Sequence, residues 1–393
     1  MQQSSIEWLG RGVWFLIFSI AVITPGVYAA PIIPPPPSIA ASSYLLIDAK
    51  SKKVLVEKNS AQRLPPASLT KIMTAYIVEE EIKSGRLKMD EAAPISVKAW
   101  RTGGSKMFIR EGTEVAVTDL LKGVIIQSGN DASVALAEHI AGSEDAFADM
   151  MNQQADALGL TNTNFLNATG LPDEEHYSTA EDLAQLTIAL IQNHPEQYQL
   201  YAQRSYKFNN IDQPNRNKLL WRDRSVDGVK TGYTSAAGYC LVASAERNGV
   251  RLVSVVMGTD SDEARMRESQ KLLSYGFRNF DTQTLYQEGI NLQQLDIYFG
   301  QSEKIDLGVG EDITVTFPRG YYDDIQVEMV LPEYLEAPIA VATQVGEIRL
   351  TLDDELLYSA PLQTLQAVEE SNFFSRLGDS IYLFYASIFS DDG

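Results

Sequence analysis

A serine and a lysine stand three positions apart in Ser68-Leu69-Thr70-Lys71. Pro65-Pro66 precedes them and favours a helix start, so both side chains are expected on one helix face, one turn apart. A serine hydroxyl is a poor nucleophile near its ordinary pKa, but a neutral lysine amine can accept its proton. Burial and a second nearby cation would keep that amine neutral by lowering its pKa. The pair could form a nucleophile and its base, although so short a motif also arises by chance.

Two further motifs could complete such a centre. Ser128-Gly129-Asn130 breaks two apolar helical segments, where the glycine is expected to turn the chain and the hydroxyl and amide to point into a cleft. Lys230-Thr231-Gly232 precedes a predicted strand, where its cation and hydroxyl could bind a carboxylate and its glycine could let a substrate lie against the strand edge. Lys83-Ser84-Gly85 fits the same pattern but ends the helix that Ser68 begins, so we interpret it as a helix exit.

Composition excludes several other kinds of site. The 393 residues carry a formal net charge of −20, which nucleic acid phosphates would repel. Cys240 is the only cysteine, so it can form no intramolecular disulfide, and we predict a buried strand residue. The three histidines, His139, His176 and His194, lack the helical spacing that places two imidazoles on one metal. We therefore expect no metal and no cofactor.

The elements that must position these motifs form two compositional zones. Residues 43–284 mix predicted strands with a long run of helices, and Asn248-Gly249 between two apolar runs predicts a β-hairpin. This pattern predicts an α/β (α+β) domain in which an antiparallel sheet carries a helical insertion. Residues 285–366 contain short alternating runs broken by Gly and Pro, which predicts a small all-β domain.

Both ends of the chain are expected to interact with a membrane, the first during export and the second as an anchor. Residues 1–29 are typical of a cleaved signal peptide, because the apolar run Val13–Ile23 is too short to cross a bilayer of about 30 Å. Residues 30–42 form a proline-rich lead-in. In residues 367–393, apolar side chains recur on one face of a helix predicted from about Glu370 to Phe389, which could lie in a membrane interface or pack on protein. Arg376 is its only cation, so attachment would depend on apolar burial.

The order and context of the motifs resemble the penicillin-recognising serine enzymes. The surrounding residues are similar to the low-molecular-mass D-alanyl-D-alanine carboxypeptidases of the penicillin-binding protein 5 type, serine peptidase family S11. The resemblance covers nearly the whole chain and rests on four segments: residues 65–74, 127–132, 215–217 and 226–232.

This resemblance implies a role for each motif residue. Ser68 would be the acylated nucleophile, Lys71 its general base and Ser128 a proton relay. The substrate would be held by Asn130 at its amide, by Lys230 and Thr231 at its carboxylate, and by the neighbouring residues Gly232, Tyr233, Arg216 and Arg265. Arg267 is the alternative candidate for the position that the resemblance gives to Arg265. Many relatives carry histidine where this chain has Tyr233, which still offers a backbone N–H to an oxyanion.

The resemblance also implies a substrate, an inhibitor class and a location. The enzyme would remove the terminal D-Ala from peptidoglycan pentapeptides, be acylated by β-lactam antibiotics, and lie in the periplasm on the outer face of the inner membrane. Three alternatives stay open: a β-lactamase, a peptidoglycan DD-endopeptidase and a non-enzymatic wall-binding scaffold. A class A β-lactamase needs a glutamate for deacylation, and residues 167–175 could contain one.

Overall fold

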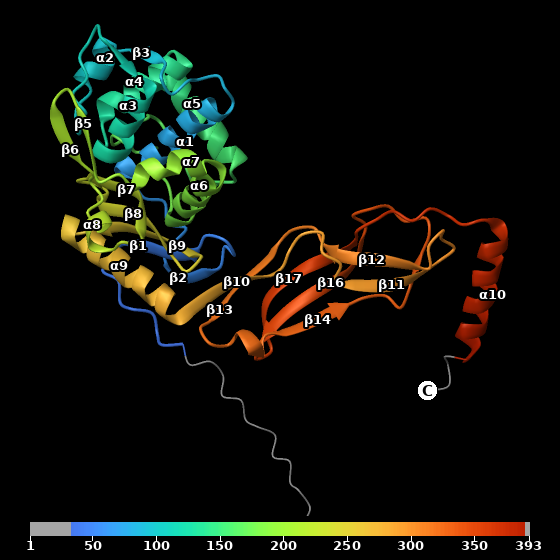
Figure 1. Cartoon of the computed structure of the whole chain (residues 1–393). Coiled ribbons are helices and arrows are strands. Elements are labelled where there is room, and N and C mark those ends of the chain that lie inside the picture. The colour runs from blue at the N-terminus through green and yellow to red at the C-terminus, as the bar shows by residue number, and fades with distance from the viewer. Residues whose placement is uncertain (1–32, 390–393) are drawn as a thin grey trace, which may run out of the picture. The chain divides into compact units, whose positions relative to one another are not determined.

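The computed structural model describes residues 33–389, and the side chains of residues 33–385. The predicted signal peptide at 1–29 lies outside the described residues, as do residues 390–393 and the side chain of Ile388. Residues 43–279 form a mixed α/β unit, which is followed by a β-rich unit and a final helix (Figure 1). The predicted fold class is confirmed.

A five-stranded antiparallel sheet forms the base of the first unit, in the order β2-β1-β9-β8-β7. The strands are β1 (Ser43–Asp48), β2 (Val54–Lys58), β7 (Val226–Thr234), β8 (Gly238–Arg247) and β9 (Val250–Thr259). Asn248 and Gly249 both have positive φ, which is the conformation that a two-residue hairpin turn requires, so the predicted β8–β9 hairpin is confirmed. The strand with the Lys230 motif, β7, lies at the sheet edge.

Helices cover both faces of this sheet (Figure 1). Apolar residues of α8 (Leu219–Arg222) and α9 (Asp262–Asn279) share one buried cluster with one face of the sheet, and the helical insertion shares another with the opposite face. The insertion consists of η1 (Ala67–Thr70), α1 (Lys71–Lys83), α2 (Val97–Arg101), α3 (Val117–Lys122), the π-helix η2 (Gly123–Gln127), α4 (Asn130–Ala141), α5 (Glu144–Ala157), α6 (Ala180–Asn193), α7 (Pro195–Tyr198) and η3 (Gln199–Ala202). Two short hairpins complete it: β3 (Ala92–Pro94) with β4 (Glu114–Ala116), and β5 (Ser205–Phe208) with β6 (Ile211–Pro214).

The β-rich unit has a six-stranded sheet in the order β14-β16-β17-β12-β11-β15 and a two-stranded ribbon, β10-β13. Its elements are β10 (Phe280–Tyr286), β11 (Gln293–Tyr298), β12 (Lys304–Val309), β13 (Ile313–Pro318), η4 (Tyr322–Asp324), β14 (Gln326–Val330), β15 (Leu335–Glu336), β16 (Gln344–Leu352) and β17 (Glu355–Thr364). The expected boundary between residues 284 and 285 falls inside β10. The expected boundary between 366 and 367 precedes Val368, which is buried in this unit and bridges to Ile339.

The predicted C-terminal helix is present as α10 (Phe373–Phe389). No helix within residues 33–389 is long and apolar enough to cross a membrane.

Candidate active site

Ser68 and Lys71 lie side by side where a 3-10 helix continues into an α-helix. Ser68 lies in the 3-10 helix η1, in which side chains three positions apart eclipse, and η1 leads directly into α1 at Lys71. The Lys71 Nζ donates hydrogen bonds to Ser68 Oγ at 3.2 Å, to Asn130 Oδ1 at 2.7 Å and to the Thr169 carbonyl oxygen at 2.5 Å. The lysine amine therefore has a fixed position beside the serine hydroxyl.

The Lys71 amine is also suited to accept a proton. Its side chain is 1% exposed, and this burial lowers its pKa from 10.5 to about 7, against the opposing charges of Asp131 and Glu144. Lys230 is a second buried cation of the site. Its own pKa is lowered well below the ordinary lysine value, first by burial and then by Lys71, Arg265 and Arg216.

Ser128 connects the second and third motifs. Its Oγ accepts a hydrogen bond from Lys230 Nζ at 2.8 Å, across 102 residues of sequence. The prediction that Gly129 turns the chain is wrong: Ser128 has the left-handed backbone conformation at φ 63°, and Gly129 is extended at φ −64°. Gly129 serves a close approach instead, because a Cβ there would lie 2.9 Å from Asp131 Oδ1 and 3.1 Å from the Met107 nitrogen.

A cavity of about 530 Å³ opens beside Ser68. Four of the predicted site residues line it: Ser68, Asn130, Arg216 and Tyr233. Lys71, Ser128 and Lys230 are almost fully buried. Lys71 bonds to the lining residues Ser68 and Asn130, whereas Lys230 and Ser128 bond to each other. The nucleophile thus faces the cavity while the two lysines are shielded from water.

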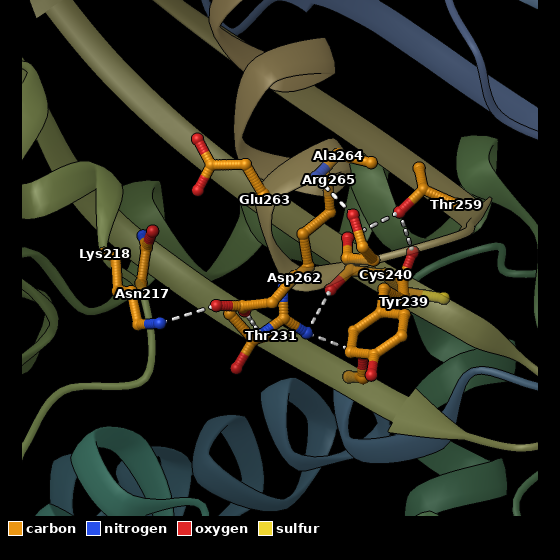
Figure 2. A network of polar contacts seen from close by, with 12 residues as sticks. Asn217, Lys218, Thr231, Tyr239, Cys240, Thr259, Asp262, Glu263, Ala264 and Arg265 are labelled. Atoms are coloured by element: carbon orange, nitrogen blue, oxygen red, sulfur yellow. Dashed lines mark hydrogen bonds and ion pairs between the residues drawn. The ribbon is translucent and has the colours of Figure 1, made fainter.

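Gly232 and Arg265 support the edge strand. A Cβ at Gly232 would lie 3.0 Å from the Pro66 carbonyl oxygen, so the glycine lets η1 approach β7. From α9, the Arg265 Nη1 donates to the Gly232 carbonyl oxygen at 2.9 Å, and Nη2 pairs with Asp262 (Figure 2). Arg265 does not line the cavity beside Ser68. Arg267 is half exposed and pairs with Glu268.

The other single residues weighed from the sequence lie outside this cluster. Cys240 is buried in β8, and burial raises the pKa of its thiol to about 11, as expected of a structural residue. Lys83-Ser84-Gly85 ends α1, with Gly85 at φ 76°, which confirms the helix exit.

Two residues of the site were missed from the sequence. Asp131 follows the second motif, and its carboxylate accepts backbone N–H groups of Met107 and Phe108 at 2.9 Å each, which orders the loop beside the cavity. Its position directly after Asn130 was the available signal. Thr169 contributes its backbone carbonyl to Lys71, and no residue type could have indicated that.

Comparison with known proteins gives consistent matches. Residues 31–261 match the family described as D-alanyl-D-alanine carboxypeptidase, peptidase S11, and residues 280–370 match the penicillin-binding protein 5 C-terminal domain. In Escherichia coli K12, carboxypeptidase DacC is 41% identical over 388 residues, covering 97% of this chain and 96% of the relative. DacA of that organism is 43% identical over 361 residues, covering 90% of each.

A solved structure agrees with these matches. Penicillin-binding protein 5 from Haemophilus influenzae superposes with a TM-score of 0.83 and 42% identity, covering 86% of this chain and 99% of the other. The chain therefore belongs to the S11 family of D-alanyl-D-alanine carboxypeptidases, as an enzyme of the penicillin-binding protein 5 type.

Proposed function

We propose that Ser68 is the nucleophile of this serine D-Ala-D-Ala carboxypeptidase and that Lys71 is its general base. The observation that carries the assignment is the contact between a buried lysine amine and Ser68 Oγ at 3.2 Å. A lysine with a pKa of about 7 is largely neutral in mildly alkaline solution, so it can accept the hydroxyl proton. Ser68 faces the cavity, where a peptide carbonyl can reach it.

Acylation follows from this arrangement. Ser68 Oγ attacks the carbonyl carbon of the penultimate D-Ala while its proton passes to Lys71 Nζ. The C–N bond then breaks and the leaving D-Ala nitrogen takes up a proton. Ser128 is the proposed relay for it, because its hydroxyl contacts Lys230 Nζ at 2.8 Å. Transfer of the proton through Ser128 returns Lys71 to its neutral form.

Deacylation uses the same base. A water molecule attacks the ester carbon and gives a proton to Lys71, the C–O bond breaks, and that proton returns to Ser68 Oγ. The exposed backbone around Ser68 and Tyr233 supplies the candidate N–H donors for the oxyanion in both steps. The products are free D-Ala and a shortened peptide.

The terminal carboxylate of the substrate is the proposed ligand of the cationic side of the site. Lys230 and Thr231 lie on the edge strand, and Arg216 lines the cavity with an exposed side chain. Asn130 is the proposed contact for the substrate amide. In the free enzyme its amide is held at both ends, by Lys71 Nζ at Oδ1 and through its own donation to the Gly103 carbonyl oxygen at 2.7 Å.

A class A β-lactamase mechanism is disfavoured by the lining of this cavity. Within residues 33–389, no Asp or Glu side chain lines it. The loop that was a candidate for such a glutamate contributes Thr169, Gly170 and Leu171 instead, while Glu174 and Glu175 are exposed. We expect β-lactams to acylate Ser68 and to leave slowly.

We further propose that the mature enzyme is exported and attached to the outer face of the inner membrane by α10. The exposed apolar side chains of this helix support the proposed membrane attachment: Phe373, Phe374, Leu377, Ile381, Tyr382 and Tyr385. A helix with such a face binds a bilayer interface by burying apolar area.

One set of assays tests the proposed function. The protein is given a pentapeptide ending in D-Ala-D-Ala, a cross-linked muropeptide and benzylpenicillin, and D-Ala release, cross-link cleavage and penicillin hydrolysis are measured. D-Ala release with a persistent penicillin adduct is expected from the wild type, and neither from Ser68→Ala. Ser105→Ala, which removes another serine hydroxyl lining the cavity, should keep the adduct. Stoichiometric labelling of Ser68→Ala would disprove the nucleophile.

A further inference from the structure

The base Lys71 is oriented from outside its own helix by a loop spanning residues 164–177. The Thr169 carbonyl oxygen accepts from Lys71 Nζ, and the neighbouring Ala168 carbonyl oxygen accepts from Thr74 Oγ1 at 2.7 Å. At Gly170 a Cβ would lie 1.8 Å from the Ala67 carbonyl oxygen, so the loop backbone is in direct contact with η1. Any movement of this loop would move the acceptor of the Lys71 amine.

One side chain builds the turn that presents this carbonyl. Asn167 Oδ1 accepts backbone N–H groups from Thr169 at 3.1 Å, Gly170 at 2.8 Å and Leu171 at 3.2 Å, and also the Thr169 hydroxyl at 2.8 Å. These bonds form only when the amide oxygen of Asn167 points into the turn. The Nδ2 group then points away from these N–H donors, and it donates to the Leu171 carbonyl oxygen at 3.1 Å as well as facing His176.

His176 lies on that other side and is 3% exposed. Its Nδ1 faces two N–H donors, the Leu166 backbone at 3.2 Å and Asn167 Nδ2 at 3.3 Å, so Nδ1 is the acceptor and the ring proton is on Nε2. Nε2 then donates to Thr70 Oγ1 at 2.8 Å. Burial, with Lys71 adding to it and Asp173 opposing it, lowers the pKa of His176 to about 4, which keeps the ring neutral as this pattern requires.

We propose that His176 is a positioning residue for the Lys71 general base. Its ring connects the loop to η1 at Thr70, two residues from the nucleophile. Together with the Leu171 carbonyl oxygen, it holds the Asn167 amide orientation that aims the Thr169 carbonyl at Lys71 Nζ. The inference rests on the proposed role of Lys71. It adds a residue that touches neither substrate nor Ser68 but controls where the base stands.

We expect the loss of His176 to lower kcat and to leave KM almost unchanged. A misplaced base slows proton transfer in acylation and deacylation, whereas carboxylate binding depends on the edge strand β7, which His176 does not contact in the hydrogen bonds described. His176→Ala should therefore lower kcat for D-Ala release, and the rate of penicillin acylation, by about tenfold or more. KM should stay within about threefold of the wild-type value.

Two companion variants separate positioning from general stability. His176→Gln retains an amide that can donate to Thr70, so it should recover most of the lost kcat. His194 is the matched control, because it is a buried histidine, 1% exposed, that packs on Tyr76 and faces Glu80 rather than the site. His194→Ala should lower the thermal unfolding midpoint much as His176→Ala does, with kcat within about twofold of the wild type.

The experiment measures kcat, KM, the acylation rate and the unfolding midpoint of these proteins together with Lys71→Ala. Wild-type kcat in a folded His176→Ala protein would overturn the inference, as would an equal loss of kcat in His194→Ala. If His176→Ala does not fold, Thr70→Val, which keeps the side-chain volume but removes the hydroxyl, must show the same loss of kcat. Normal acylation by Lys71→Ala would refute the general base itself, a result distinct from failure at His176.

Discussion

At the scale of single residues, side chains with reactive groups could be predicted from the sequence, and groups that act through the backbone could not. Ser68, Lys71, Ser128 and Lys230 carry hydroxyls and amines at recognisable spacing. The structure brings them together as two hydrogen-bonded pairs, Lys71 with Ser68 and Lys230 with Ser128. The Thr169 carbonyl has no residue-type signal, because every residue has such a group.

Arg265 illustrates the same limit. The resemblance implies a substrate-binding role for it, and in the structure its guanidinium donates to the carbonyl oxygens of Gly232 and Cys240. Whether Arg265 or Arg267 enters the protein depends on the phase of α9 relative to the sheet. The sequence alone does not give this helix phase, because the phase depends on how the helix packs on the sheet, and the strand order of the sheet is not known from the sequence.

We predict that Arg265→Ala weakens both the fold and the substrate site. Loss of buried, charge-assisted hydrogen bonds should lower the free energy of unfolding by about 2 kcal/mol, and KM for the pentapeptide should rise because the Gly232 strand loses its support. Urea unfolding and steady-state kinetics measure the two effects. Arg267→Ala is the control and should leave KM unchanged, since the half-exposed Arg267 pairs with the buried carboxylate of Glu268 and not with β7. An Arg265→Ala enzyme with wild-type KM would contradict the supporting role.

At the scale of elements, local turn signals were reliable and exact backbone conformations were not. Asn248-Gly249 predicted its hairpin because Asn and Gly tolerate the positive φ values that the favoured two-residue turn between antiparallel strands requires. At Ser128 the positive φ falls on the serine rather than on the neighbouring glycine. Packing decides this, since Gly129 is needed where the backbone nears Asp131 and Met107.

The contact between the 164–177 loop and η1 gives a prediction at this scale. Gly170→Ala should lower kcat by about a hundredfold or more, because the added Cβ would overlap the Ala67 carbonyl and push the loop from Lys71. Gly142→Ala is its control: Gly142 has a similar positive φ of 78°, with nothing within 4 Å of an added Cβ. It should lose about 1 kcal/mol of stability and keep its kcat. Kinetics and thermal unfolding of both variants measure this, and equal kcat values would refute the role of the loop.

At the scale of the whole molecule, the sequence predicted the order of fold types but could not define their edges. The hydropathy pattern changes near residue 285, but β10 already begins at Phe280. It follows α9 directly, so no turn residues mark the start of the strand. Pairing of β1 with β9, more than 200 residues later, also has no local signal. No expectation drawn from the sequence included this pairing.

Membrane attachment is tested by removing α10, which contacts the β-rich unit through Asp379 at the Phe299 nitrogen and through Tyr382 on Tyr298. Because Val368 is buried in that unit, deletion of residues 373–393 is preferable to deletion from residue 367. The shortened protein should leave the membrane fraction and retain D-Ala release. High salt should fail to release the full chain, since burial contributes about 25 cal/mol per Å² and the helix has one cation, Arg376. A truncated protein that stays on membranes would move the anchor elsewhere.

The most direct test of the account is the pH dependence of Ser68 acylation. The pKa of Lys71 is lowered from 10.5 to about 7, chiefly by burial, so the amine becomes neutral as the pH rises through 7. The second-order rate of benzylpenicillin acylation, measured by mass spectrometry from pH 5 to 9, should rise with a midpoint near 7 and then level. At pH 6 it should be about a tenth of the plateau. A rate that is flat across this range would contradict a neutral Lys71 as the general base.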